Sequence, residues 1–165
     1  MPKPKKSNPV KVPVDPNALD ALIERNLSYF EGIADDTKKQ MMSILTDGLT
    51  KGTDLWTVRD QLVELGYDKN RAEMIARTES MYALNEGAKA SYRESDIEYV
   101  KWLSSYDDRT CTADNGPEIE LPDGSVVYGC EAMDGKIFRI DECPPCPVHP
   151  QCRCSLAPNR GPEDY

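Results

Sequence analysis

The sequence predicts an α+β protein in which a helical N-terminal half packs on a small C-terminal module of strands and loops. Apolar residues recur at helical spacing through the first 96 residues. Short β-branched and aromatic runs, separated by turn sequences, follow them. All six cysteines lie between Cys111 and Cys154. We therefore expect a local cross-link or a bound ion to hold the second half together.

Composition excludes several classes of protein. The 165 residues carry 20 lysines and arginines against 29 acidic residues, a net charge of −9. A general nucleic-acid coat protein would need a basic face to displace counterions. No apolar run approaches the roughly 18 residues of a membrane span, and no signal-peptide pattern stands at the N-terminus. We expect no membrane contact and synthesis in a reducing cytosol.

The chain divides into four expected regions. Residues 1–14 are a basic arm with four prolines, four lysines and no apolar periodicity. This composition is typical of a flexible tail, and a peptide that docks on a partner is the alternative. Residues 15–96 are the helical region, 97–158 the cysteine-rich β module and 159–165 a tail.

Three short helices are expected before residue 67. The first begins with Asp15 as N-cap and Pro16 at the first helical position, and it ends at Gly32. The second runs from Thr37 to Asp47 with Gly48 after its end, and the third has Thr53 as its N-cap and stops at Gly66. None is long enough to be stable alone in water. Their inward residues are expected to be Leu19, Leu22, Ile23, Leu27 and Phe30, then Met41, Ile44 and Leu45, then Leu55, Val58, Leu62 and Leu65.

A longer fourth helix is expected from Asp68 to about Ser95. One of its faces mixes apolar and polar side chains: Met74, Thr78, Met81, Asn85, Ala88 and Tyr92. Because a buried Thr or Asn needs hydrogen-bond partners, this face should meet polar backbone as well as apolar side chains.

The β module is expected to contain one strand at Ile97–Leu103 and a hairpin around the turn Pro122-Asp123-Gly124. The hairpin strands are 118–121 and 125–128, and a further short strand runs from Lys136 to Ile140. Five prolines between residues 144 and 158 predict an extended or turning chain after Cys143.

The most specific chemical pattern is His149-x-x-Cys152-x-Cys154, which contains the only histidine. Thiolate and imidazole together suit Zn²⁺. Cys111 and Cys130 are the candidates for further ligands, because the hairpin between them returns the chain near its start. The expected set is Cys111, Cys130, Cys152 and either His149 or Cys154. Plain buried thiols are the alternative.

Other candidate chemistry is weaker. Cys143-Pro-Pro-Cys146 has ligand spacing, but its prolines remove backbone N–H groups that support thiolate sulfur, so free or incidentally paired thiols are expected. The pair Asp107-Asp108 is more typical of a solvated turn. Phosphate-loop, G-x-S-x-G and H-E-x-x-H motifs do not occur.

Several segments together resemble the phage Mu protein F-like family, the minor capsid or head morphogenesis proteins of tailed bacteriophages. In order, they are Arg71–Glu79 with Asn85 and Gly87, Val100–Leu103, Asp107–Cys111, Cys130–Phe138 and Pro147–Cys154. The family commonly has a C-x-x-C pair before the D-G-K turn. Here Asp114 stands in the second position, and Cys130 keeps the short distance to Asp134-Gly135-Lys136. The resemblance thus implies that residues 112–129 are a hairpin inserted between paired ligands.

The resemblance implies a minor head protein that acts in head morphogenesis inside the capsid, near the portal. Its expected partners are the portal protein and other capsid or scaffold proteins, with weak contact to packaged DNA. Assembly would occur in the host cytoplasm. We expect no enzymatic activity, and we expect structural roles for five polar residues: Arg77, Thr78, Glu79, Asn85 and Asp134. The alternatives are a head-carried effector enzyme, a nuclease or transferase, and a zinc-binding adaptor.

Overall fold

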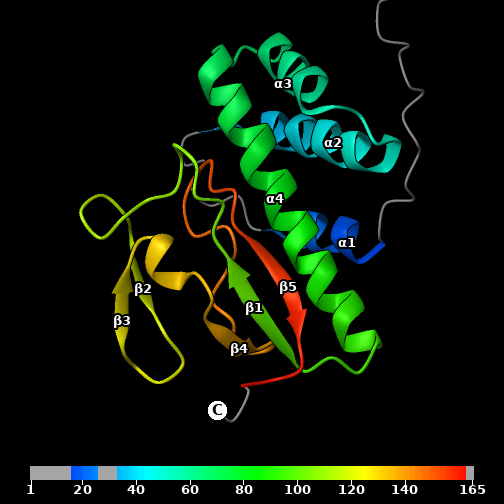
Figure 1. Ribbon diagram of the computed structural model, residues 1–165. Coiled ribbons are helices and arrows are strands. Elements are labelled where there is room, and N and C mark those ends of the chain that lie inside the picture. Colours follow the sequence, from blue (N-terminus) through cyan, green and yellow to red (C-terminus); the bar gives the residue numbers. More distant parts are fainter. Residues whose placement is uncertain (1–15, 26–32, 163–165) are drawn as a thin grey trace, which may run out of the picture.

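The computed structural model describes residues 16–25 and 33–162 (Figure 1). Four helices form the first half, and small antiparallel sheets with long loops form the second, so the predicted fold class is confirmed. The expected arm, the cap at Asp15 and the predicted first-helix residues Leu27, Phe30 and Gly32 lie outside the described residues, as do 163–165 of the tail.

The helical half is built on its longest helix. Helices α1 (Pro16–Glu24), α2 (Asp35–Lys51) and α3 (Leu55–Glu64) all contact α4 (Lys69–Glu94). Together they bury one apolar cluster that includes Leu22, Met41, Leu45, Val58, Leu62 and Ile75. Ile23, expected to face inward, is exposed instead, and Ala18 is buried in this part of α1. The small side chain fits because α1 approaches α4 closely at Gly87, where an added Cβ would lie 2.7 Å from the Ala18 Cβ.

Several helix boundaries differ from the prediction. The first helix ends at Glu24 rather than Gly32, and α2 begins at Asp35 rather than Thr37. The third helix is capped by Asp54 rather than Thr53, because the Asp54 carboxylate accepts hydrogen bonds from the backbone N–H of Trp56 and Thr57. Helix α2 continues through Gly48 and ends at Gly52, whose φ of 62° is left-handed. Gly48 has a packing role, since an added Cβ would lie 2.7 Å from Val58 Cγ2 on α3.

The β module comprises two antiparallel sheets. Strand β1 (Tyr99–Leu103) is central in a three-stranded sheet, between β4 (Ile137–Arg139) and β5 (Ser155–Asn159). The hairpin of β2 (Glu118–Glu120) and β3 (Val126–Tyr128) forms the second sheet, and the short 3-10 helix η1 (Glu131–Met133) follows it. The buried core of the module contains Trp102, Met133 and Phe138 beside five of the six cysteines.

Strand β5 is the element that the sequence did not predict. It pairs along β1 over five residues although Pro158 lies within it, and an edge strand tolerates a proline that lacks a donor. Helix α4 covers its outer edge: Asn85 Oδ1 accepts the Leu156 N–H at 3.1 Å, and the Tyr92 hydroxyl donates to the Leu156 carbonyl at 3.3 Å. The expectation that this face of α4 meets polar backbone is confirmed.

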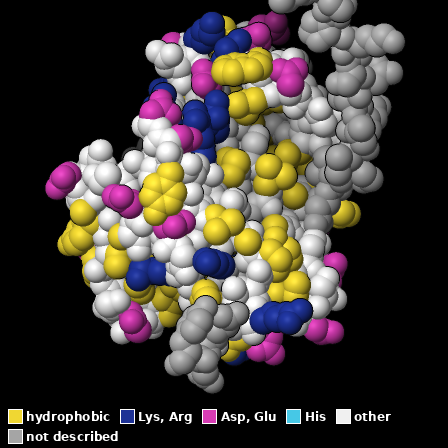
Figure 2. All heavy atoms as spheres, viewed as in Figure 1, with side chains coloured by type: hydrophobic (Ala, Val, Ile, Leu, Met, Phe, Trp, Pro, Cys, Tyr) yellow, Lys and Arg dark blue, Asp and Glu magenta, His cyan; other side chains and the backbone are white. Residues whose placement is uncertain are grey.

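Charge is distributed rather than gathered on the face shown in Figure 2, where lysine and arginine side chains lie at separate places among acidic and hydrophobic ones. That face offers no continuous basic surface of the kind that nucleic-acid coats use. Among the described residues, no helix is both long and apolar enough to cross a bilayer.

Candidate metal centre

Five potential metal donors gather in the β module as two groups that share one residue. We call Cys130, Cys152 and Cys154 the inner triad, and Cys111, Cys130 and His149 the outer triad. Within each triad all donor atoms lie within 4.8 Å of one another. The five predicted ligands therefore meet, but as two triads joined at Cys130 rather than as one set of four.

One donor–donor distance in each triad is close to that of a zinc site. Cys130 Sγ lies 3.6 Å from Cys152 Sγ and 3.1 Å from His149 Nε2. With Zn–S and Zn–N bonds of about 2.3 and 2.0 Å, tetrahedral geometry separates two sulfurs by about 3.8 Å and a sulfur from a nitrogen by about 3.5 Å. The other donor pairs of each triad lie within 4.8 Å, so the donors would draw together by up to about 1 Å around an ion.

Local backbone geometry brings the cysteine segments together. Cys130 begins the turn of η1 directly after Gly129, whose φ is 77°. An added Cβ on Gly129 would overlap the carbonyl group of Thr112, so only glycine lets the chain at Cys111 come this close. The Glu131 N–H then donates to the Cys111 carbonyl at 3.0 Å. Cys152 and Cys154 lie on the segment that leads into β5, and Figure 1 shows this segment beside α4.

Hydrogen bonds connect the sulfurs and favour the thiolate form at Cys152. The Cys130 N–H donates to Cys111 Sγ at 3.0 Å. The pKa of Cys152 is lowered, chiefly because the Cys130 thiol donates to its sulfur, with backbone N–H groups of Cys154 and Val148 helping. The pKa of Cys130 is correspondingly raised by its bond to Cys152. Without an ion, one of this close pair keeps its proton.

A contact of Nδ1 with the backbone orients the ring of His149. Nδ1 lies 2.8 Å from the Pro150 carbonyl oxygen, and a proton assigned to Nδ1 is donated there. Nε2 then carries the free lone pair, directed at Cys130 Sγ. Ligating histidines commonly donate their second N–H in this way.

Asp134 organises the loop beside the cysteines. Its Oδ1 accepts the Ser104 N–H at 2.8 Å, and its Oδ2 accepts the Tyr106 hydroxyl at 3.1 Å. Ser104 in turn donates from Oγ to the Cys130 carbonyl at 2.6 Å. Asp134 thus acts on the metal donors through Ser104, which the sequence did not single out because no motif marks it.

Helix α4 fixes the segment that carries Cys152 and Cys154. The buried Asn85 donates from Nδ2 to the Cys154 carbonyl at 3.2 Å and to Cys146 Sγ at 3.4 Å. About two turns earlier on α4, Thr78 Oγ1 accepts the N–H of Gln151 at 2.9 Å. Both residues therefore connect α4 to the cysteine-bearing loop.

The other two polar residues of α4 have separate partners. Arg77 pairs with Glu73 on the same helix at 3.4 Å. The fully buried Glu79 pairs with Arg25 Nε at 2.7 Å, and desolvation raises the pKa of Glu79 although the Arg25 charge opposes that shift. Arg25 also stacks 3.8 Å over the ring of Tyr82. These residues do not converge with Thr78 and Asn85 on one reacting centre.

Cys143 and Cys146 belong to neither triad. Burial raises the pKa of half-buried Cys143 to about 11 and that of Cys146 further. Cys146 is fully buried, and its thiol donates to the Cys154 carbonyl at 3.3 Å. Both are neutral thiols at physiological pH, and Cys146 contributes to packing.

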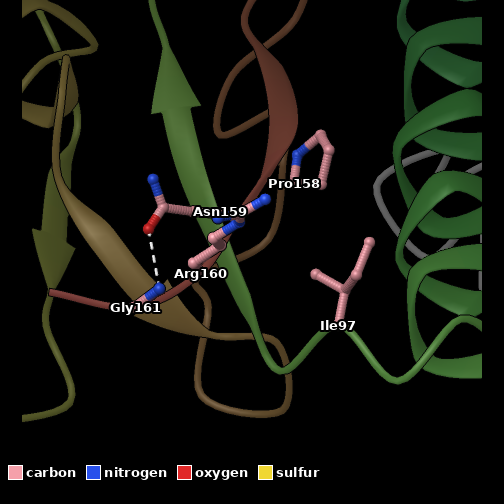
Figure 3. A pocket seen from close by; sticks show the side chains of 5 residues that line it. All are labelled: Ile97, Pro158, Asn159, Arg160 and Gly161. Atoms are coloured by element: carbon pink, nitrogen blue, oxygen red, sulfur yellow. Dashed lines mark hydrogen bonds between the residues drawn. The ribbon is translucent and has the colours of Figure 1, made fainter.

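The two triads differ in access. All three residues of the inner triad are buried. Cys111 and His149 of the outer triad line a cleft of about 400 Å³, together with Met74, Asp108, Arg109, Thr110, Asn115, Pro150 and Gln151. A second pocket of about 400 Å³ lies at the far end of β5, lined by Ile97 and residues 158–161, and holds no thiol or carboxylate (Figure 3). An accessible ligand position is therefore associated with the outer triad.

No protein-family model, curated protein or solved structure matches this chain. The donor geometry and the residue contacts are thus the basis for its function. They show a cysteine-rich cluster that could hold a metal ion such as zinc.

Proposed function

We propose that the cysteine cluster binds zinc and that this ion is structural, holding the β module together. The observation that carries the proposal is the buried inner triad, in which three thiols lie within 4.8 Å of one another. Three sulfurs this close could bind one ion as thiolates, and the ion would offset the cost of burying their charge. Zinc fits because its structural sites take cysteine and histidine ligands.

The rest of the module supports a structural role for the ion. Its strands β2, β3 and β4 have three residues each, and such short strands are marginal without further support. Cys111, Cys130 and the pair Cys152 and Cys154 come from three separate segments, and all four belong to the module's buried core. An ion at Cys130 would therefore connect the hairpin to the segment before β5.

We further propose that the chain acts as a minor head protein in the head morphogenesis of a tailed bacteriophage. Support comes from the resemblance of its ordered segments, four of which supply or position donors of the cysteine cluster. Thr78 and Asn85 bind the segment of residues 151–156, and Asp134 positions Ser104 against Cys130. The chain would lie inside the capsid near the portal, after assembly in the host cytoplasm.

The contacts of α4 favour this structural function over a head-carried nuclease or transferase. The residues such an enzyme would use are Arg77, Thr78, Glu79 and His149. The first three each have a partner of their own within the fold, and His149 Nε2 lies 3.1 Å from Cys130 Sγ in the cysteine cluster. Zinc at a buried triad alone would also suit an adaptor. Binding to portal or scaffold protein separates the head protein from that alternative.

Two experiments test the proposals. Elemental analysis of the full chain purified under reductant should find zinc, and zinc-free protein that folds unchanged in chelator would contradict the structural ion. Pull-down on the portal protein encoded by the same genome should retain the chain at low salt. Deletion of residues 1–13, which contain four lysines and no apolar periodicity, should weaken that binding without lowering the melting temperature. Binding through these charges should also weaken with added salt, because ion pairs are screened over about 8–10 Å. Failure of the full chain to bind portal or scaffold would contradict the assigned role.

A further inference from the structure

We propose that the cluster holds two metal ions bridged by the Cys130 thiolate, and that the outer ion keeps a coordination position open to the cleft. This inference rests on the proposed zinc binding and deepens it. The inner ion would be held by Cys130, Cys152 and Cys154, and the outer ion by Cys111, Cys130 and His149.

The arrangement of donors favours two ions over one. The two triads share only Cys130, whereas one tetrahedral ion needs four donors that are all mutually close. Cys130 Sγ contacts a donor of each triad, Cys152 Sγ at 3.6 Å and His149 Nε2 at 3.1 Å. A thiolate sulfur has lone pairs for both ions, so Cys130 can serve both without moving away from either.

Geometry places the donors of the outer triad for a metal. Cys111 Sγ accepts the Cys130 N–H at 3.0 Å, which holds this sulfur beside Cys130. His149 Nδ1 lies 2.8 Å from the Pro150 carbonyl oxygen, which leaves Nε2 directed at Cys130 Sγ. Ligating histidines commonly use their second nitrogen in this way.

Two divalent ions would also balance the charge of the cluster. When both ions are bound, Cys111, Cys130, Cys152 and Cys154 coordinate as four thiolates with four negative charges. These side chains are at most 9% exposed, and two divalent ions make the buried cluster neutral.

The open position follows from the cleft. Three protein donors leave a zinc ion one vacancy, which catalytic sites fill with water or substrate. Cys111 and His149 both line the cleft, and so does Arg109, whose side chain is about half exposed. A small anion could therefore bind the outer ion with Arg109 nearby. The hydroxyl of Ser104, 3.8 Å from Cys154 Sγ, offers the inner ion an oxygen from the protein instead.

Metal stoichiometry by native mass spectrometry of the full chain tests the inference. Wild type should carry two zinc ions and His149→Gln one, and Cys143→Ser, which changes a thiol outside both triads, should retain two. One ion in both wild type and His149→Gln overturns the bridged pair and leaves the structural zinc intact. No zinc in wild type overturns the proposed function as well.

The open position is tested with cobalt in place of zinc. Sodium azide should alter the visible spectrum of the cobalt-loaded wild type by binding the outer ion. It should leave the spectrum of cobalt-loaded His149→Gln unchanged, because that variant keeps only the inner ion. An azide response of equal size in both proteins, or in neither, contradicts an open outer ion.

Discussion

The two halves of this molecule reach order by different means. In the helical half, α4 buries apolar side chains of α1, α2 and α3 in a cluster without a cysteine. In the β module, five of the six cysteines are buried in the core beside apolar residues such as Trp102, Ile119 and Leu156. Burial of apolar surface stabilises the first half under any redox or metal condition. The second half should depend on its ion, so the two halves should respond differently to the same perturbation.

The largest difference is expected for Cys130→Ser. This change removes the donor that both triads share, and structural zinc contributes on the order of 10 kcal/mol to small metal-dependent folds. The β module should lose its fixed structure while α1–α4 remain helical. The near-ultraviolet circular dichroism signal, to which the buried Trp102 contributes, should collapse. The far-ultraviolet signal of the helices should largely persist. Cys143→Ser is the matched control and should change neither signal.

In the helical half, the largest single effect is expected for Arg25→Ala. Glu79 is fully buried and pairs with Arg25, so its charge would lose its cation, at a cost of about 3 kcal/mol at pH 7. The pKa of Glu79 is raised by burial, so the folded state binds a proton more readily than the unfolded chain. As the pH falls below that raised pKa, Glu79 becomes neutral and the penalty shrinks.

Urea unfolding of wild type and Arg25→Ala at pH 7 and pH 5 measures this effect. The difference in unfolding free energy between the two proteins should be smaller at pH 5. The two proteins are compared with each other at the same pH. An effect of acid on the metal centre would be common to both proteins, so it cancels in the difference. Lys51→Ala, which removes an exposed pair with Asp47, should cost less than about 1 kcal/mol. A loss for Arg25→Ala that is equal at both pH values would mean that Glu79 is not its cause.

The junction between the halves should respond to Asn85→Ala. The change leaves the Leu156 N–H and the Cys154 carbonyl without their α4 partner. The expected cost is about 1–3 kcal/mol, and zinc affinity should also fall because the Cys154 segment is held less firmly. Isothermal titration with zinc checks the affinity. Unchanged stability together with a loss of portal binding would assign Asn85 to an interface instead.

The smallest expected effect is that of Gly87→Ala. The new methyl group would meet the backbone of Ala18 at 2.8 Å, which pushes α1 away, but alanine also favours the helix by about 1 kcal/mol. A net loss of about 1 kcal/mol is expected, without any change in zinc affinity. A change in affinity would show that α1 packing and the metal centre are linked.

Local signals in the sequence predicted most elements. The cap at Asp68 and the mixed face through Asn85 located α4, and the Pro122-Asp123-Gly124 turn located the hairpin. Strand β5 was not predicted because contacts with distant parts of the sequence define it. Strand β1 sets its register, and Asn85 and Tyr92 of α4 bind the backbone groups on its outer edge. The role of Gly48 depends on Val58 of the next helix, and no local rule reveals such contacts.

The donors of the centre were predictable by residue type, but their grouping was not. Spacing suggested one ion with four of the five donors. The division into two triads arises from tertiary geometry, in particular the approach of Gly129 to Thr112 that places Cys111 beside Cys130. Likewise, Ser104 became recognisable only through its bond to the Cys130 carbonyl.

The most direct test of the different stabilisation of the two halves is hydrogen–deuterium exchange of the full chain, with and without a zinc chelator under reductant. Metal removal should abolish protection in peptides covering residues 99–103 and 126–159 while leaving residues 69–84 of α4 protected. Equal protection of both regions in the chelated and untreated protein, or equal loss in both, would contradict a metal-dependent module on a metal-independent helical half.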